Sequence, residues 1–398
     1  MKAGRVLIVT HYWPPHVGGI ETVAVEQASR LAERGWEVRV VTSRLRGDEA
    51  HERYGPVMVD RFRCVNLLER LYSVPVPLVS PTMLFGLWKR TRKADVVVAH
   101  GHVYIGTSFA AVAARLRKRP FVLVQHAPFI DYGRGLNVVE RAADRTVGRR
   151  VIRSARTVIA VSEFTADFVR SLVPDAPIEI VGSGVDHGRF TANAAAAESR
   201  PSRARPTVLT VRRLVPRNGV DCLVEAWQRA GLGARAELVI GGTGPEIAEI
   251  QKLAAGDPSI RVLGYVPDDE LPALYRNADL FVLPSRSGEG FGLVALEAMA
   301  SGLPVLATSS GGVVDIVKDG VNGRLVPPND VPGLAEALTQ LVDDGPLRTE
   351  LAQGARRSAG ASTWDGSIDL LAGALVDAMV PPSVAPGRST PERSHRTP

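Results

Sequence analysis

Short apolar runs alternate along the chain with amphipathic segments, and this alternation predicts the fold class. The runs are bounded by turn residues, as buried strands are, whereas segment 21–35 has apolar residues at helical spacing and ends at Gly35, a common helix terminator. Strands that alternate with helices form a parallel sheet covered on both faces. The predicted strands are residues 5–10, 36–43, 95–100, 121–127, 157–162 and 178–184.

A second series of the same kind begins at residue 207. The segment that precedes it, residues 191–206, is rich in Ala, Ser, Pro and Arg and has no apolar period, so we interpret it as a linker. A chain of 398 residues is long enough for two domains. We therefore predict an α/β protein with two Rossmann-like domains, residues 1–190 and 207–362, that bind ligand between the carboxyl ends of their sheets.

Composition and cysteine use narrow the class of protein. Hydrophobic residues make up 45% of the chain and charged residues 23%, which is typical of a globular protein. No apolar run approaches the ~20 residues of a membrane-spanning helix, and the N-terminus is interpreted as a first strand rather than a leader. Cys64 and Cys222 fall in different predicted domains, so we expect no disulfide and a cytoplasmic location. Residues 381–398, rich in proline, are predicted to be disordered.

The formal net charge is +6, and one segment carries a distinctive part of it. Arg141, Arg145, Arg149 and Arg153 are spaced to line one face of a helix. Apolar residues lie beside them in the sequence, so the segment could rest on an anionic membrane surface. The alternative is an ordinary helix with one buried and one solvated face. The apolar neighbours are Val138, Val139, Val147, Val151 and Ile152.

The clearest chemistry lies in a loop and helix of the second predicted domain. A buried strand over residues 281–285 leads into a glycine-rich loop, and a helix is expected from Leu293 to Ala300. Glu289 precedes this helix and Glu297 lies within it. Free amides at a helix start favour phosphate, whereas a carboxylate can bind a sugar diol through paired hydrogen bonds. The pattern therefore suits a sugar nucleotide.

The segment EGFGLVALE resembles the hallmark of the retaining glycosyltransferases of the GT-B fold, family 4: a glutamate, seven residues and a second glutamate, with Phe-Gly after the first. The resemblance implies that Glu289, with Gly290, Phe291 and Gly292, holds the donor sugar. It also implies that Glu297 binds the ribose hydroxyls. In that family a helix after the second sheet crosses back to the first domain, and here we expect it at residues 363–380.

Residues 211–219 resemble the family's Gly-Arg-Leu pattern followed by Lys-Gly, in which an arginine and a lysine neutralise the donor diphosphate. Arg213 matches the arginine. The chain departs from the pattern at Arg212, where glycine is usual, and at Asn218, where lysine is expected. Because asparagine cannot offset phosphate charge, we expect Arg217 to take that role, the alternative being a solvated loop residue.

Further candidate residues lie in both domains. Gly18 and Gly19, between the first strand and a helix, are predicted to present amides to the leaving diphosphate. By resemblance, His126 approaches the transferred sugar and acts with Glu289 and Arg213 in catalysis; taken alone, a histidine at a strand end is more often structural. His100 and His102 are weaker candidates on the acceptor side. Gly244, Tyr265 and Val266 are expected beside the nucleobase.

The sequence shows no metal-ligand spacing and no Ser-His-Asp order, and family 4 enzymes work without a divalent metal. We therefore expect no cofactor besides the nucleoside diphosphate sugar. The prediction is a metal-independent, retaining hexosyltransferase with a hydroxyl acceptor: a glycolipid, a lipid-linked saccharide or a small molecule. No nucleic acid partner is expected. Two alternatives stay open, a non-catalytic sugar-nucleotide-binding protein and a sugar-nucleotide epimerase of the same fold.

Overall fold

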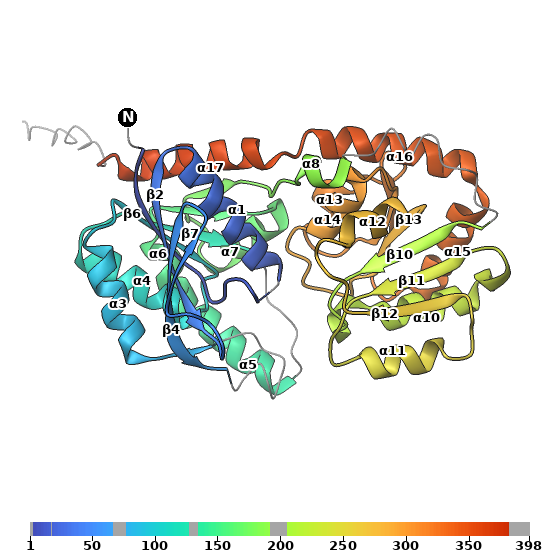
Figure 1. Cartoon of the computed structure of the whole chain (residues 1–398), viewed down its shortest axis with the longest axis horizontal. Coiled ribbons are helices and arrows are strands. Elements are labelled where there is room, and N and C mark those ends of the chain that lie inside the picture. Colours follow the sequence, from blue (N-terminus) through green and yellow to red (C-terminus); the bar gives the residue numbers. More distant parts are fainter. Residues whose placement is uncertain (1–2, 17, 67–76, 127–133, 192–204, 382–398) are drawn as a thin grey trace, which may run out of the picture.

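A computed structural model describes residues 3–16, 18–66, 77–126, 134–191 and 205–381. It has two α/β lobes side by side, with two long C-terminal helices running along one edge of both (Figure 1). The prediction of two parallel-sheet domains is confirmed. Most of the predicted linker and tail lie outside the described residues, at 192–204 and 382–398.

The first domain is built on a sheet whose described strands have the order β3-β4-β2-β1-β6-β7-β8-β9. Neighbours are parallel except β3, which is antiparallel to β4, and β5, which pairs with β4 off this path. The strands are β1 (Gly4–Val9), β2 (Trp36–Arg44), β3 (His51–Tyr54), β4 (Val57–Val65), β5 (Leu78–Val79), β6 (Val96–His100), β7 (Phe121–Gln125), β8 (Thr157–Ala160) and β9 (Ile178–Ile180). The helices include α1 (Gly19–Glu33), α3 (Pro81–Thr91), α4 (Ile105–Leu116), α5 (Arg134–Ala143), α6 (Arg149–Ser154), α7 (Glu163–Leu172) and α8 (His187–Thr191).

The strands β3, β4 and β5 were not predicted from the sequence. β4 carries Asp60 and Arg61, which are buried yet charged, so its apolar pattern is broken. The Asp60 carboxylate is bound by Arg39, Arg90 and His51, which is why it can lie in the sheet.

The second domain has an entirely parallel sheet in the order β12-β11-β10-β13-β14-β15. Its carboxyl ends carry the loops that form the candidate site described below. The strands are β10 (Thr207–Val211), β11 (Glu237–Gly241), β12 (Ile260–Gly264), β13 (Leu280–Leu283), β14 (Val305–Thr308) and β15 (Gly323–Val326). The helices include α10 (Val220–Arg229), α11 (Ile247–Ala254), α12 (Leu271–Arg276), α13 (Leu293–Ala300), α14 (Val313–Ile316), α15 (Val331–Asp343), α16 (Gly345–Gly360) and α17 (Trp364–Met379).

Helix α17 returns from the second domain and packs on the first (Figure 1). Its apolar face, including Ile368, Leu371 and Leu375, joins the core that covers β1 and β6. Arg34 of α1 binds Asp365 at 2.9 Å and Asp369 at 2.8 Å, so α17 is also held by ion pairs. The C-terminal segment is therefore part of the first domain's core.

The predicted basic helix differs from the expectation. Residues 134–154 form α5, a π-helical turn (Asp144–Gly148) and α6 rather than one regular helix. Val151 and Ile152, expected beside the arginine stripe, are buried at 4% and 0% exposure because α6 packs into the domain core. Val138 and Val139 of α5 are exposed, at 67% and 66%.

Two further features concern membrane-spanning helices and disulfides. Among the described residues, the structure contains no helix with the length and apolarity required to cross a bilayer. No disulfide joins Cys64 and Cys222, which lie in separate domains.

The chain passes between the domains twice, and the two passages lie against each other. Val185 donates its N–H to the carbonyl of Ser362 at 3.1 Å and pairs with Thr363 as an isolated bridge. A Cβ atom on Gly184 would lie 2.1 Å from the backbone nitrogen of Trp364. Only glycine fits at this crossing.

We expect Gly184→Ala to lower the free energy of unfolding by about 1–3 kcal/mol, because the added methyl overlaps the backbone of Trp364. Gly373→Ala on α17, where a Cβ would meet nothing within 4 Å, is the matched control and should raise stability by about 0.5–1 kcal/mol. Denaturant titration of both variants measures the difference. Equal stability of the two would contradict the tight crossing.

Candidate functional site where the two domains meet

Glu289 lies in the loop between β13 and α13, and its carboxylate has two close partners. Oε2 of Glu289 accepts hydrogen bonds from Nη2 of Arg212 at 3.1 Å and from Oγ of Ser285 at 3.0 Å. Nη1 of Arg212 also donates to Oγ of Ser285, at 2.9 Å. The Arg212 side chain is only 6% exposed and that of Glu289 19%. The predicted sugar-binding carboxylate therefore contacts a buried cation, Arg212, at the position where the family pattern has glycine.

The backbone of the same loop is fixed by a glycine turn after β14. Gly312 donates its N–H to the carbonyl of Glu289 at 2.8 Å. A Cβ on Gly311 would lie 2.0 Å from that carbonyl oxygen, so this turn contacts the loop directly. The positions of Glu289 and Gly290 are thereby set by a segment from the next strand.

Glu297 lies within α13, as expected, and is half-buried. Burial raises the pKa of Glu297 to about 7, although a hydrogen bond from Tyr275 and the charge of Arg189 work in the opposite direction. The hydroxyl of Tyr275 donates to Oε2 of Glu297 at 3.0 Å. The charge state of this carboxyl group therefore changes near neutral pH. Tyr275 belongs to α12 and was not predicted as a site residue.

The two arginines expected to bind the diphosphate, Arg213 and Arg217, differ in their burial. The side chain of Arg213 is exposed, and its carbonyl accepts a hydrogen bond from Nδ2 of Asn218 at 2.6 Å. Asn218 thus supports the loop where the family pattern expects a lysine. Arg217 is half-buried, and a Cβ on Gly288 would lie 4.0 Å from its Cδ atom. Of the expected diphosphate-binding pair, Arg217 is the one placed beside the glycine loop.

The first domain contacts this loop through the start of α7. Oγ of Ser162, the N-cap of α7, donates to the carbonyl of Gly290 at 2.7 Å, and the N–H of Glu163 donates to Oδ2 of Asp315 at 2.8 Å. A Cβ on Gly182 would lie 3.2 Å from the ring of Phe291. The predicted sugar-binding loop is therefore also a contact between the domains.

Gly18 and Gly19 lie at the start of α1. Their predicted role is to present backbone amides to the leaving diphosphate, which requires that no other anion covers them. A Cβ on Gly19 would lie 3.9 Å from Leu293 of α13, so this turn reaches the second domain. The carboxylate of Glu21 covers Gly18, with Oε2 2.4 Å from the position of a Cβ. His11 and His16 each approach Oε1 of Glu21 to 3.3 Å. Burial would raise the pKa of Glu21, but His16 and His11 lower it on balance, so an internal anion occupies this turn.

The three histidines named from the sequence fall into two separate contacts. Nε2 of His126 lies 2.8 Å from Nδ1 of His100, and the rings are stacked. Burial lowers the pKa of His126 to about 3 and that of His100 well below its usual range, so this pair is neutral. His102 instead contacts Asp144 at 2.8 Å and Gln125 at 3.0 Å, which is a structural arrangement away from the pair.

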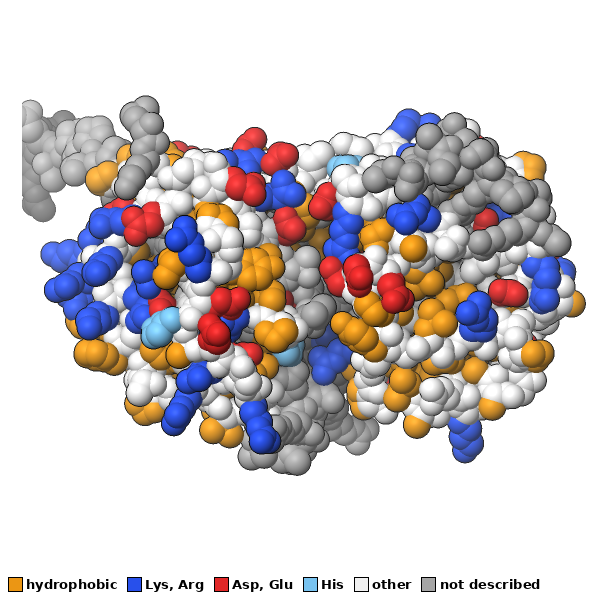
Figure 2. Space-filling model, in the orientation of Figure 1, with side chains coloured by type: hydrophobic (Ala, Val, Ile, Leu, Met, Phe, Trp, Pro, Cys, Tyr) orange, Lys and Arg blue, Asp and Glu red, His pale blue; other side chains and the backbone are white. Residues whose placement is uncertain are grey.

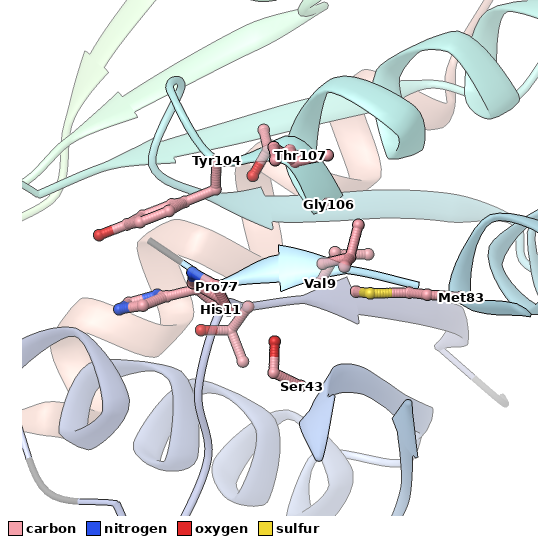
Figure 3. A pocket seen from close by; sticks show the side chains of 11 residues that line it. Val9, His11, Ser43, Pro77, Met83, Tyr104, Gly106 and Thr107 are labelled. Atoms are coloured by element: carbon pink, nitrogen blue, oxygen red, sulfur yellow. The ribbon is translucent and has the colours of Figure 1, made fainter. Parts of the chain in front are cut away.

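A small pocket opens at the carboxyl end of β1 in the first domain (Figure 3). The rings of His11 and Tyr104 stack at a centroid distance of 4.1 Å on one side of it, and Met83 lies on the other. The hydroxyl groups of Thr10 and Ser43 line it, and both are buried without a hydrogen-bond partner among the described residues. The pocket therefore combines apolar walls with polar groups that can still form hydrogen bonds.

The residues expected beside a nucleobase end the neighbouring strands β11 and β12. A Cβ on Gly244 would lie 2.1 Å from the carbonyl oxygen of Leu214, so the turn packs against the loop after β10. Val266 packs near Gly241, whereas the side chain of Tyr265 is 67% exposed. The backbone of these residues lies at the same sheet edge as Glu289, and their contact with a base stays a prediction.

Comparison with known proteins gives a consistent result along the chain. Residues 17–189 match the family described as Glycosyltransferase Family 4, and residues 192–358 match Glycosyl transferases group 1. The chain is 30% identical to the GDP-mannose-dependent alpha-(1-6)-phosphatidylinositol monomannoside mannosyltransferase of Mycobacterium tuberculosis, over 85% of this chain and 89% of that protein. It is 31% identical to the D-inositol 3-phosphate glycosyltransferase of Geodermatophilus obscurus, over 94% and 88%.

Solved structures support the fold. The sucrose-phosphate synthase of Thermosynechococcus elongatus superimposes with a TM-score of 0.77, covering 94% of this chain and 98% of that one. The sequence identity is 22%, so this similarity concerns the architecture.

We expect Glu297→Gln to become more stable relative to the wild type as pH rises. Since burial raises the pKa of Glu297 to about 7, the folded wild type binds this proton more tightly than the unfolded chain, and its stability falls between about pH 4.5 and 7. Glutamine cannot ionise, and it still accepts a hydrogen bond from Tyr275. The difference in unfolding free energy should therefore grow by up to about 3 kcal/mol between pH 5 and 8 in denaturant titrations.

Glu336→Gln, at an exposed position of α15, is the control for this measurement. A difference for Glu297→Gln that does not change with pH would show that the carboxyl group is not buried in solution.

Proposed function

Because the chain belongs to the family 4, group 1 glycosyltransferases, we propose that it transfers a hexose from a nucleoside diphosphate sugar to a hydroxyl acceptor, with retention and without a divalent metal. The mannosyltransferase of Mycobacterium tuberculosis is GDP-mannose-dependent, and we propose by analogy that this chain also uses a nucleoside diphosphate sugar as donor. The observation that carries the proposal is the loop and helix with two glutamates in contrasting environments. Glu289 is paired with a cation, whereas Glu297 is half-buried beside a phenol.

The two ends of the donor need different carboxylates. The sugar presents hydroxyls next to the bond that breaks, and Glu289 lies where the domains meet, in the loop that Ser162 contacts. The ribose presents a diol that does not react, and Glu297, beside Tyr275, would bind it. Between them, the amides at the start of α13 and the cation of Arg217 would stabilise the diphosphate, with Arg213 at the rim.

Transfer would then proceed on one face of the sugar. The acceptor oxygen forms a bond to the anomeric carbon while the bond from that carbon to the diphosphate oxygen breaks, and this leaving oxygen takes the acceptor's proton. His126 is neutral because burial lowers its pKa to about 3, so it would bind a hydroxyl rather than carry charge. No nucleophilic side chain is needed, and stabilisation of the leaving diphosphate supplies the main effect.

Glu297→Ala should weaken donor binding by about tenfold or more, because a ribose diol loses its acceptor. Glu289→Ala should mainly lower kcat, by about 10²-fold, because its hydroxyl contact matters most where bonds change. UDP-, GDP- and ADP-sugars are first screened by thermal shift to identify the donor, since a ligand that binds the folded state raises Tm. Isothermal titration and acceptor-dependent release of the nucleoside diphosphate then give affinity and rate for each variant.

Glu336→Ala is the control for both variants, and addition of EDTA should leave the wild-type rate unchanged. Nucleotide release that does not depend on an acceptor, or wild-type affinity and rate in both variants, would overturn the proposal.

The acceptor is proposed to be lipid-linked, since one relative acts on a phosphatidylinositol mannoside. Helix α5 exposes Val138 and Val139, and exposed arginines follow it at Arg145 and Arg153. Lys and Arg side chains also gather on the outer edge of the first domain near α3 (Figure 2). A surface with exposed apolar groups beside cations suits an anionic bilayer.

We expect the protein to float with vesicles that contain anionic lipid and not with neutral vesicles. Val138→Ser with Val139→Ser, or Arg145→Glu, should reduce the bound fraction severalfold, since each arginine contributes about 1 kcal/mol near such a surface. Leu370→Ser, which changes an exposed apolar residue of α17, is the control and should float normally. Failure to float with either vesicle would favour a water-soluble acceptor, such as the inositol phosphate of the second relative.

A further inference from the structure

Arg212 forms a closed triangle with Ser285 and Glu289. Its Nη2 atom binds Oε2 of Glu289 at 3.1 Å, its Nη1 atom binds Oγ of Ser285 at 2.9 Å, and this hydroxyl donates to the same Oε2 at 3.0 Å. Ser285 is 1% exposed and the Arg212 side chain 6%. One oxygen of the Glu289 carboxylate is therefore engaged by two buried donors.

The main chain on both sides of this triangle is fixed by its neighbours. Arg212 donates its N–H to the carbonyl of Gly241 at 3.0 Å, and a Cβ on Gly242 would lie 1.8 Å from the carbonyl oxygen of Arg212. On the other side, the carbonyl of Glu289 is held by Gly312. The guanidinium and the carboxylate thus meet between two anchored loops, so neither group has to be ordered when a ligand arrives.

The contact is a poor source of stability. Burial lowers the pKa of the Arg212 guanidinium, Glu289 offsets this only in part, and the nearby charge of Arg217 adds to the lowering. A buried ion pair often contributes no more to stability than apolar residues of the same size. The main effect of the contact between Arg212 and Glu289 is therefore on the position of the Glu289 carboxylate.

We propose that Arg212 is a positioning residue, which with Ser285 fixes Oε2 of Glu289 so that Oε1 accepts a hydrogen bond from the donor sugar. The proposal rests on the proposed function, in which Glu289 binds that sugar. Arg212 acts through Glu289 and does not itself contact the sugar. Glycine, the residue usual here in the family that the sequence resembles, could not do this.

The side-chain chemistry predicts how substitutions should rank. Lysine keeps the charge, but its single ammonium group cannot copy the two directed contacts of the guanidinium with Ser285 and Glu289. Glutamine keeps much of the volume and removes the charge. Without the guanidinium, Oε2 of Glu289 keeps only the hydrogen bond from Ser285, so the carboxylate is held less firmly.

The test is a double-mutant cycle with Arg212→Gln, Glu289→Gln and the combined variant, measured as transfer rates. We expect Arg212→Gln to lower kcat by about tenfold or more with a small change in donor KM. Arg212→Lys should recover part of the rate. In the Glu289→Gln background, loss of Arg212 should cost less than about twofold, because its target is already changed.

Arg286→Gln is the matched control, because Arg286 lies on the same loop but binds Asp221 and Asn329. Its removal should change kcat by less than about twofold. If Arg212→Gln does not fold, Arg212→Gly takes its place in the cycle.

The two proposals fail in different ways. Losses that multiply in the combined variant, or an unchanged kcat in Arg212→Gln, would overturn the positioning role while transfer itself remains. Full transfer activity in Glu289→Gln would instead overturn the assignment of Glu289. A denaturant-unfolding cycle on the same four proteins reports whether the two side chains interact in solution, and absence of coupling there would also overturn the positioning role.

Discussion

Direct contact between backbone segments at the carboxyl ends of the second sheet is the constraint on which the site depends. The turns after β11 and β14 reach the carbonyl oxygens of Arg212 and Glu289 so closely that a Cβ at Gly242 or Gly311 would overlap them. The loops after β10 and β13 are therefore held by segments from other strands. Rigid support of this kind lets two side chains meet in a defined geometry without losing further conformational entropy.

Buried ionisable groups at the site are paired or shifted toward their neutral form, since an isolated buried charge is costly. Arg212 and Glu289 are paired. His126 is neutral because burial lowers its pKa to about 3. Glu297 is intermediate, because burial raises its pKa to about 7 and Tyr275 gives it a hydrogen bond. A hydroxyl-rich ligand would supply further hydrogen bonds to these groups, which connects their burial with sugar recognition.

The two domains are joined by contacts of different kinds. Helix α17 places an apolar face in the core of the first domain, which is a stable attachment. At the site, the described contacts include hydrogen bonds from Ser162 to Gly290 and from Glu163 to Asp315. Hydrogen bonds of this kind exchange readily with water, so the site side of the junction is the weaker one. The loop that would bind the sugar is thus also in direct contact with the first domain.

The sequence by itself determined the architecture and the main motif. Regular apolar runs specify buried parallel strands, and the spacing of Glu289 and Glu297 around a helix start was enough to identify the loop, because both features are local. The helix over Leu293–Ala300 lies where it was predicted. The strands β3 and β4 were not predicted, since their charged residues are satisfied only by partners on other elements, such as Arg39 of β2 and Arg90 of α3 for Asp60.

The tertiary structure alone decided which side chains meet. Arg212 and Arg213 are adjacent in sequence. The Arg212 side chain nevertheless meets Glu289, whereas the Arg213 side chain is exposed. The pairing of His126 with His100, and of Glu297 with Tyr275, joins residues from different elements. Periodicity carries the direction of a side chain within one element, but its partner and its pKa depend on burial and on segments far along the chain, which only the folded packing brings together.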